Sequence, residues 1–489
     1  MRYDACIIGA GAEGLAAAAT MAACGLKVIV LERDSRCGGR CAIREFHQGF
    51  RASPFADELA AIPSDIFGAL GLARHGAILA PAPASTALWP DRHDLILPRA
   101  NPPGVFARSE KLRREILDRA AADARVAPSH GWFAARTPAT PWPGEALCGR
   151  TLAQEIGEAG TDAHAHVMAS LLAGRTCDTQ LAGSAVQLLG GTGGGMVAGG
   201  LGRLGDALRA SAEAAGAEIS CGLEVSDIKR KSGRVVGAGL ADGTEIAARA
   251  VISTLDLKRT FLALFTWSDL PPALVERVGA FRPSPGTARL LLALETLPDL
   301  PAGVDPLAWR GPLHLAPSPD ASADAYRAWR GGMLPERPPV MLRAVSSLDP
   351  SLAPVGAASV TLTLGAIPHT PFDGPWTKEK RDKLRDAALA IVEEVLPGTR
   401  ARVLGAELIV PPDMEDALGV TGGDLAGGEL APDQMLGLRP FAQCQGSRTP
   451  IEGLYLAGPS STLGPVASCA SGVTAARAVM ADFAAGRLK

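Results

Sequence analysis

Residues 3–34 read YDACIIGAGAEGLAAAATMAACGLKVIVLERD, and this stretch decides the fold. The apolar run Cys6–Ile8 predicts a short buried strand that leads into Gly9-Ala10-Gly11-Ala12-Glu13-Gly14, a GxGxxG pattern. A helix of small residues follows, Gly25 ends it, and KVIVLE predicts a second strand closed by Glu32. A strand, a glycine turn, a helix and a second strand in this order predict a Rossmann-type dinucleotide-binding unit.

The glycines of this pattern have separate physical roles. Gly9 permits the tight turn, Gly11 lets the backbone approach a pyrophosphate, and Gly14 lets the helix pack closely on the strand. The phosphates are expected at the start of the helix, where unpaired N–H groups and the helix dipole favour negative charge. Ala12 and Glu13 stand at this start, so we count both among the cofactor-binding residues.

Glu32 stands 18 residues after Gly14, at the end of the second predicted strand. An acid at this place accepts hydrogen bonds from the 2′-hydroxyl of an adenosine ribose, and it argues against a 2′-phosphate. We include Arg33, the next residue, among the candidate cofactor contacts. The alternative, a glycine-rich turn without a ligand, leaves an acid at this spacing unexplained. The pattern alone does not separate FAD from NAD.

A second glycine motif bears on that choice. Residues 33–43 read RDSRCGGRCAI and place Gly38-Gly39-Arg40 just after the second strand. This resembles the GG motif of the FAD-dependent phytoene desaturase/amine oxidase superfamily, in which a glycine turn and an arginine approach the pyrophosphate and the flavin ribityl chain. The resemblance implies FAD as the cofactor, in contact with Gly39 and Arg40. Without the two glycines, Arg40 would be read as an ordinary surface arginine.

Two later segments resemble the same superfamily. Residues 203–253 predict a helix and four strands, a block that completes the FAD-binding domain there, with backbone at Val225 against the adenine. Residues 451–483, IEGLYLAGPSSTLGPVASCASGVTAARAVMADF, resemble the closing motif, whose loop follows the isoalloxazine ring and whose helix points at its pyrimidine end. The resemblance implies that small residues of this loop contact the flavin: Gly458, Gly464, Val466, Ala467 and Ser468. Thr462-Leu463 replaces the His-Pro pair common in the family.

Residues 411–440, PPDMEDALGVTGGDLAGGELAPDQMLGLRP, are similar to one branch of that superfamily. This is the branch called pyridine nucleotide-disulfide oxidoreductase domain protein 2-like. The resemblance covers roughly two thirds of the chain, is most specific at both ends, and is weakest between residues 80 and 187.

The expected fold class is α/β, with a Rossmann-type (GR2-like) FAD-binding domain and an interleaved α+β substrate-binding domain. We assign residues 1–75, 188–265 and 401–489 to the FAD-binding domain, and residues 76–187 and 266–400 to the substrate-binding domain. The second set is rich in Pro, Ala and Leu and holds all seven tryptophans. These side chains would line an apolar pocket above the flavin or pack in an ordinary core.

The resemblance implies an FAD-dependent oxidoreductase that dehydrogenates or saturates a C–C bond of an apolar, isoprenoid- or carotenoid-like small molecule, with hydride transfer at flavin N5. No acid–base constellation stands out, which suits a reaction carried by the cofactor. His369 is the single catalytic candidate, with a structural role as its alternative.

Other functions stay open at this point. A flavin amine oxidase on the same fold would want an aromatic cage, and the chain has only three tyrosines, Tyr3, Tyr326 and Tyr455. A partner protein that binds FAD without catalysis is a further alternative, because the loop at 459–469 departs from the family pattern. An NAD-only dehydrogenase would leave the C-terminal loop unexplained.

The composition excludes several classes of partner. The net charge is −3 without a basic block, so we expect no nucleic acid. The nine cysteines form no CxxC pairs, which favours buried, reduced thiols and a cytoplasmic location. We expect no metal, although His164 and His166 have HxH spacing.

The ends and the hydropathy of the chain add two expectations. The first strand begins within MRYDACIIGAG, so we expect no leader peptide, and no apolar run reaches about 18 residues. Peripheral membrane contact stays open, and the sequence does not indicate an oligomeric state.

Overall fold

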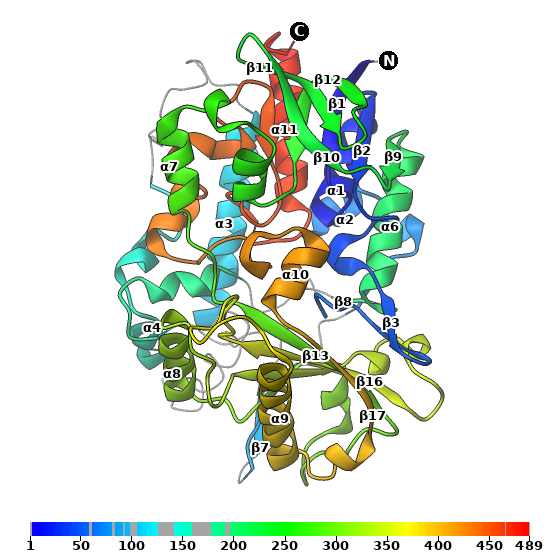
Figure 1. Ribbon diagram of the computed structural model, residues 1–489, viewed down its shortest axis with the longest axis vertical. Coiled ribbons are helices and arrows are strands. Elements are labelled where there is room, and N and C mark those ends of the chain that lie inside the picture. The colour runs from blue at the N-terminus through cyan, green and yellow to red at the C-terminus, as the bar shows by residue number, and fades with distance from the viewer. Residues whose placement is uncertain are drawn as a thin grey trace.

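The computed structural model describes residues 2–57, 61–80, 84–90, 93–97, 105–125, 141–158, 178–190, 196–464 and 466–488. Two large sheets organise these residues, one in the upper and one in the lower half of Figure 1. Both termini lie at the upper end, beside the first sheet. His164 and His166 lie outside the described residues.

The first sheet has seven strands in the order β10-β11-β12-β1-β2-β9, with β18 paired to β12. Their bounds are β1 Arg2–Ile8, β2 Val28–Glu32, β9 Glu218–Cys221, β10 Val225–Lys231, β11 Arg234–Leu240, β12 Glu245–Ser253 and β18 Leu454–Leu456. β1 runs parallel to both β2 and β12. The apolar run read from the sequence is therefore a central strand whose C-terminal end meets the glycine turn.

Helices α1 Ala12–Ala22 and α11 Ala470–Ala484 pack on one face of this sheet. Helix α6 Gly200–Ala214 lies against α1, and helix α3 Val105–Arg125 lies against α11. Small side chains let α1 and α11 approach one another closely. A Cβ at Gly472 would stand 2.0 Å from the Glu13 carbonyl oxygen, and one at Gly14 would stand 2.0 Å from that of Gly9. Only glycine fits at either place.

The opposite face of the first sheet packs on a cluster of aromatic and aliphatic side chains. Phe261 and Phe265 come from the segment that follows β12, and Leu274 and Val278 come from helix α7, Pro272–Ala280. This helix is on the left in Figure 1. Both faces of the first sheet are thus covered, as parallel strands require.

The second sheet also has seven strands, in the order β17-β13-β16-β15-β14-β6-β7. Their bounds are β6 Ser85–Leu88, β7 His93–Leu97, β13 Thr287–Leu294, β14 Leu313–Leu315, β15 Val340–Ala344, β16 Ala358–Gly365 and β17 Val403–Ile409. Alternate leucines of β13 and β16 pack against helix α9, Lys378–Val395. The sheet is largely antiparallel, because only β6 and β14 pair in parallel.

The remaining described strands and α-helices complete the fold. They are β3 Arg44–His47, β4 Phe50–Ala52, α2 Ser64–Ala69, β5 Leu79–Ala80, α4 Leu152–Glu158, β8 Met196–Val197, α8 Pro319–Arg330 and α10 Pro411–Leu418. α10 lies between the two sheets in Figure 1. No helix among the described residues is both long and apolar enough to cross a membrane.

A buried ion pair joins the segment after β4 to the second sheet, at a place that we call the junction. Asp57, just after β4, accepts a hydrogen bond of 2.6 Å from Arg289 on β13 and one of 2.5 Å from the Thr361 hydroxyl on β16. The two charged side chains are 3% and 1% exposed. Burial favours the neutral form of Asp57, but Arg289 and Thr361 outweigh it, so the pKa of this carboxyl lies below its usual value.

The elements divide somewhat differently from the predicted domains, whose boundaries stay a prediction. β17 lies in residues assigned to the FAD-binding domain, yet it pairs with β13 of the second sheet. Helix α3 lies in residues assigned to the substrate-binding domain, yet Ile116 and Ala120 pack in the core around α1 and α11. Burial of these apolar faces, rather than position in the chain, decides where each element packs.

Candidate cofactor groove

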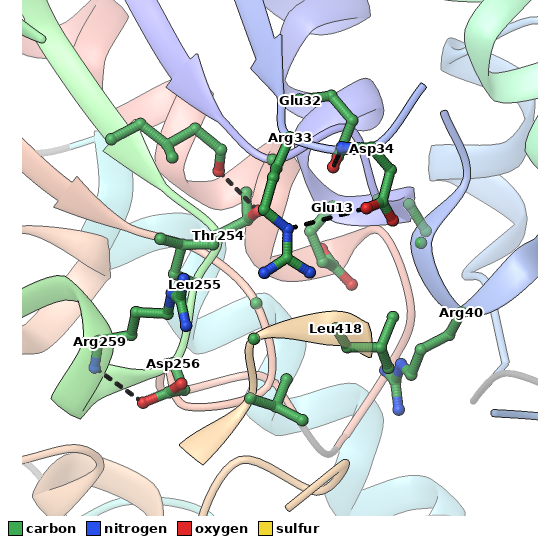
Figure 2. Close-up of a pocket in the computed structure, with 18 of the residues that line it drawn as sticks. Glu13, Glu32, Arg33, Asp34, Arg40, Thr254, Leu255, Asp256, Arg259 and Leu418 are labelled. Atoms are coloured by element: carbon green, nitrogen blue, oxygen red, sulfur yellow. Dashed lines mark hydrogen bonds and ion pairs between the residues drawn. The ribbon is translucent and has the colours of Figure 1, made fainter. Parts of the chain in front are cut away.

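A groove of about 1260 Å³, partly open to solvent, lies where β1, β2 and β12 end. It is the place where open α/β sheets bind nucleotides. Eleven of the fifteen residues that the sequence proposed for the cofactor line it: Gly9, Gly11, Ala12, Glu13, Glu32, Arg33, Gly39, Arg40, Val225, Gly458 and Ser468. Figure 2 shows several of the charged ones around this space.

The glycine turn has the geometry that a pyrophosphate site needs. Gly9 has φ +99°, in the region that favours glycine, and its N–H donates to the Leu31 carbonyl at 2.8 Å. A Cβ at Gly11 would meet no atom within 4 Å, so this position faces the open groove. A Cβ at Gly39 would stand 3.3 Å from the Gly11 Cα, which brings the two glycine motifs together.

Glu32 borders the groove at the end of β2. Its carboxylate accepts hydrogen bonds from the backbone N–H groups of Ala10, at 2.7 Å, and of Asp34, at 3.0 Å. These bonds hold the carboxylate in place. A carboxylate has about four acceptor positions, so Glu32 retains capacity for ribose hydroxyls.

The two arginines proposed from the sequence are held differently. Arg33 donates to the backbone carbonyl oxygen of Ala417, at the C-terminal end of α10, and forms an ion pair with Asp34 at 3.7 Å. Arg40 donates to the Leu425 carbonyl at 3.0 Å. Both therefore tie the groove to the end of α10 and the segment after it, whose residues Leu418–Val420, Asp424 and Leu425 form the opposite wall.

Glu13 links two helix starts that are far apart in the sequence. Its carboxylate accepts hydrogen bonds of 2.8 Å from the Cys469 N–H, the Gly472 N–H and the Ser471 hydroxyl. It thus satisfies donors at the start of α11, where the helix dipole favours a negative charge. Burial raises the pKa of Glu13 above its usual value, and these bonds and the charge of Arg40 offset only part of that effect.

The C-terminal loop approaches the groove at its two ends. Gly458 has φ +88° and lines the groove, together with Pro459 and Ser468. Its N–H donates to the Ser471 hydroxyl at 2.9 Å, which ties the loop to the start of α11.

Four residues proposed as cofactor contacts do not line the groove. Gly14 and Gly464 face backbone, since a Cβ at either would stand 2.0 or 2.1 Å from a carbonyl oxygen. Val466 and Ala467 are 4% and 3% exposed and are buried in the protein. In the structure these small residues serve close backbone packing, so their role toward the cofactor stays a prediction.

His369 lies outside the groove. Its Nε2 stands 2.7 Å from a Glu415 carboxylate oxygen, and its Nδ1 is 3.1 Å from the Thr370 hydroxyl. Glu415 also accepts from the Gly422 N–H at 3.1 Å, so the pair supports the wall after α10. This contact fits the structural alternative for His369.

Sequence reasoning missed the opposite wall of the groove. Asp256, after β12, accepts hydrogen bonds of 2.9 Å from the Thr421 N–H and hydroxyl. These bonds bring the segment Leu418–Val420 to the groove, together with Asp424 and Leu425. The polar residue at the end of a buried strand was a usable signal for Asp256, but its partner lies 165 residues away.

The residues present fit FAD. Open space stands above Gly11 at the start of α1, the anchored Glu32 carboxylate stands where the sequence predicts the ribose, and Arg40 supplies positive charge to the groove. Among the described residues no group of three His, Cys, Asp or Glu side chains could hold a metal ion.

Comparisons with known proteins agree with this site. The family model described as flavin containing amine oxidoreductase matches residues 14–480. Pyridine nucleotide-disulfide oxidoreductase domain-containing protein 2 of Rattus norvegicus is 28% identical over 545 aligned residues, which cover 98% of this chain and 94% of that protein. The 4,4′-diaponeurosporene oxygenase of Staphylococcus haemolyticus is 25% identical over 235 residues, covering 47% of this chain and 44% of that protein.

A solved structure shows the same fold. The oxidoreductase from Methanosarcina mazei superposes with a TM-score of 0.58 at 20% identity, covering 98% of this chain and 100% of that one. The predicted superfamily, α/β fold class and FAD cofactor are confirmed. Because the family model matches most of this chain, the chain belongs to the flavin containing amine oxidoreductase family and takes FAD as its cofactor.

Proposed function

We propose that this oxidoreductase dehydrogenates or saturates a C–C bond of an apolar small molecule. The observation that carries the proposal is the placement of the three tyrosines. Each is at most 8% exposed and donates to a carboxylate: Tyr3 to Glu218, Tyr326 to Glu429 and Tyr455 to Asp482. All three are buried with their hydroxyls bonded elsewhere, which argues against a tyrosine cage for an amine beside the flavin.

The side chains along the groove favour a reaction carried by the cofactor. Bound FAD accepts or donates a hydride at N5. The carboxylates described around the groove serve other bonds: Glu13 holds α11, Glu32 accepts from two backbone N–H groups, and Asp256 holds Thr421. No histidine is among the described lining residues. The lining side chains would thus bind and orient the cofactor and the substrate, and we assign no general acid or base.

The apolar class of substrate rests on similarity and on composition. The relative from Staphylococcus haemolyticus is named for its action on 4,4′-diaponeurosporene and matches 47% of this chain. The sequence left two places for the tryptophans, a pocket or a core. Two of them belong to the core between the second sheet and α9: Trp309 is 9% exposed within it, and Trp376 packs against it. The apolar pocket itself stays part of the proposal.

A flavin amine oxidase is the main alternative, because the family is described by that activity. A partner protein that binds FAD without catalysis is the other. We further infer a cytoplasmic location, which the eight free cysteines among the described residues support.

The test is anaerobic mixing of the purified FAD-bound protein with apolar polyenes, with their more saturated counterparts and with primary amines. We expect an apolar polyene or its saturated counterpart to change the visible flavin band. The band bleaches when the protein dehydrogenates the substrate. When the protein saturates the substrate, the chemically pre-reduced protein regains the band. Bleaching by amines instead would establish the amine oxidase alternative. If dithionite bleaches the flavin band but none of the tested substrates changes it, the result would support the non-catalytic partner.

A matched control separates cofactor loss from substrate failure. In Gly11→Val the new side chain points into the open groove, so the fold should persist while FAD is excluded. We expect this variant to keep the circular dichroism of the wild type and to lack the flavin band.

A further inference from the structure

Cys37 and Cys221 bring two sulfur atoms together on the outer side of the loop that forms the groove wall. Their Sγ atoms are 3.3 Å apart, although the residues are 184 positions apart in the chain. Cys37 precedes Gly38-Gly39-Arg40, and Cys221 ends β9. Both side chains are half-buried rather than sealed.

The surrounding backbone already fixes this pair. Glu32 and Cys221 are register partners in β2 and β9. Beyond them the Gly222 N–H donates to the Asp34 carbonyl at 2.9 Å, and the Gly38 N–H donates to the Ala10 carbonyl at 2.9 Å. The loop from Asp34 to Gly38 is therefore held on both sides of Cys37.

A second cavity gives small molecules access to the sulfur atoms. This open cavity encloses about 1460 Å³ and is lined by Cys37 and Cys221, together with Arg203 and Arg209 of α6. Gly38 and Cys41 line both this cavity and the cofactor groove. The loop is thus a shared wall, with the cofactor groove on one side and the two thiols on the other.

We propose that Cys37 and Cys221 form a disulfide under peroxide, and that this bond locks the loop over bound FAD. Both S–H bonds break and one S–S bond forms. The two protons and two electrons reduce one hydrogen peroxide molecule to two water molecules. A disulfide needs a sulfur separation of about 2.05 Å, so the thiols must approach by little more than an ångström. The proposal rests on FAD binding and is independent of the substrate.

The environment of Cys37 sets the conditions for oxidation. Burial and the contact with Cys221 raise the pKa of Cys37 to about 12, with Arg209 opposing and Glu32 reinforcing the shift. The thiolate is the reactive form, so oxidation should be faster in alkaline than in neutral buffer.

The first experiment treats the FAD-bound full chain with hydrogen peroxide and maps its peptides by mass spectrometry. We expect a Cys37–Cys221 cross-link, a protein lighter by two hydrogens, and reversal by dithiothreitol. Cys37→Ser and Cys221→Ser should each abolish the cross-link. Cys24→Ser should leave it unchanged, because Cys24 is an exposed cysteine that lines neither cavity.

The second experiment measures release of FAD from the oxidised and the reduced wild-type protein, which needs no variant to fold. We expect release to slow by roughly tenfold after oxidation, because the cross-link restrains local opening of the groove wall. A wild-type protein that forms no cross-link would overturn the proposed site. A cross-linked protein that releases FAD at the reduced rate would overturn the lock.

Discussion

Asp57 and Glu13 are carboxylates inside one molecule, yet they are held in opposite ways. Asp57 lies at the junction, is 1% exposed and pairs directly with the Arg289 guanidinium. Glu13 borders the groove and accepts only from backbone N–H groups and one hydroxyl. The pKa of Asp57 is lowered and that of Glu13 is raised. At Glu13, hydrogen bonds and the charge of Arg40, which makes no contact with it, thus offset burial less completely than the contacting guanidinium does at Asp57.

The largest expected effect tests the junction. Arg289→Met removes the guanidinium in contact with the buried Asp57 carboxylate, and we expect the free energy of unfolding to fall by about 3–5 kcal/mol. Urea denaturation measures the loss. Arg381→Met is the matched control, because it breaks a pair with Asp413 in which the side chains are 32% and 36% exposed. That variant should lose less than about 1 kcal/mol. Equal losses would show that burial does not distinguish the two pairs.

A smaller effect is expected at the start of α11. Glu13→Ala removes the acceptor for two backbone N–H groups and one hydroxyl, so we expect a loss of about 1–3 kcal/mol in unfolding free energy. Glu13→Gln keeps one acceptor oxygen and should lie between this variant and the wild type. Hydrogen exchange in the first turn of α11 should rise in the same order. An unchanged rate in Glu13→Ala would contradict the proposed cap.

The ribose position should affect affinity more than stability. Glu32→Gln removes a charged acceptor, and we expect the Kd for FAD to rise by about tenfold, or about 1.4 kcal/mol. Fluorescence titration of the apoprotein measures it. Glu218→Gln lies in the same sheet but faces Tyr3, away from the groove, and should leave the Kd unchanged. Similar changes in both variants would indicate a general effect of losing an acid.

The smallest expected effect is that the stabilising contributions of Asp57 and Glu13 change with pH in opposite directions. Asp57 has a lowered pKa when folded, so its stabilisation is present at neutral pH and is lost as the pH falls below about 4. Glu13 has a raised pKa, so its contribution is present in acid and is lost as the pH rises through that pKa. Relative to the wild type, Glu13→Gln should therefore gain stability as the pH rises, and Asp57→Asn should lose it. Urea midpoints of both variants and the wild type, measured as a function of pH, test this. If the two variants change with pH in the same direction relative to the wild type, the comparison is contradicted.

Much of the site was predictable from short stretches of sequence. Gly9, Gly11 and Glu32 could be placed because a tight turn, a helix start and a strand end are set by local backbone geometry. The family resemblance predicted the Gly38-Gly39 turn, whose residues have φ values of +120° and +51°. The family resemblance also predicted that the loop beginning at Gly458 belongs to the cofactor site.

The sequence by itself determined the dinucleotide-binding unit, its first glycine turn and the acid at the end of β2, because each depends on neighbours in the chain. Only the tertiary structure decided what Glu13 binds, since Cys469 lies 456 residues away. It alone also paired Cys37 with Cys221, brought residues 418–425 to the groove and assigned β17 to the second sheet. These contacts depend on which buried faces meet in space, and no local pattern in one sequence records that choice.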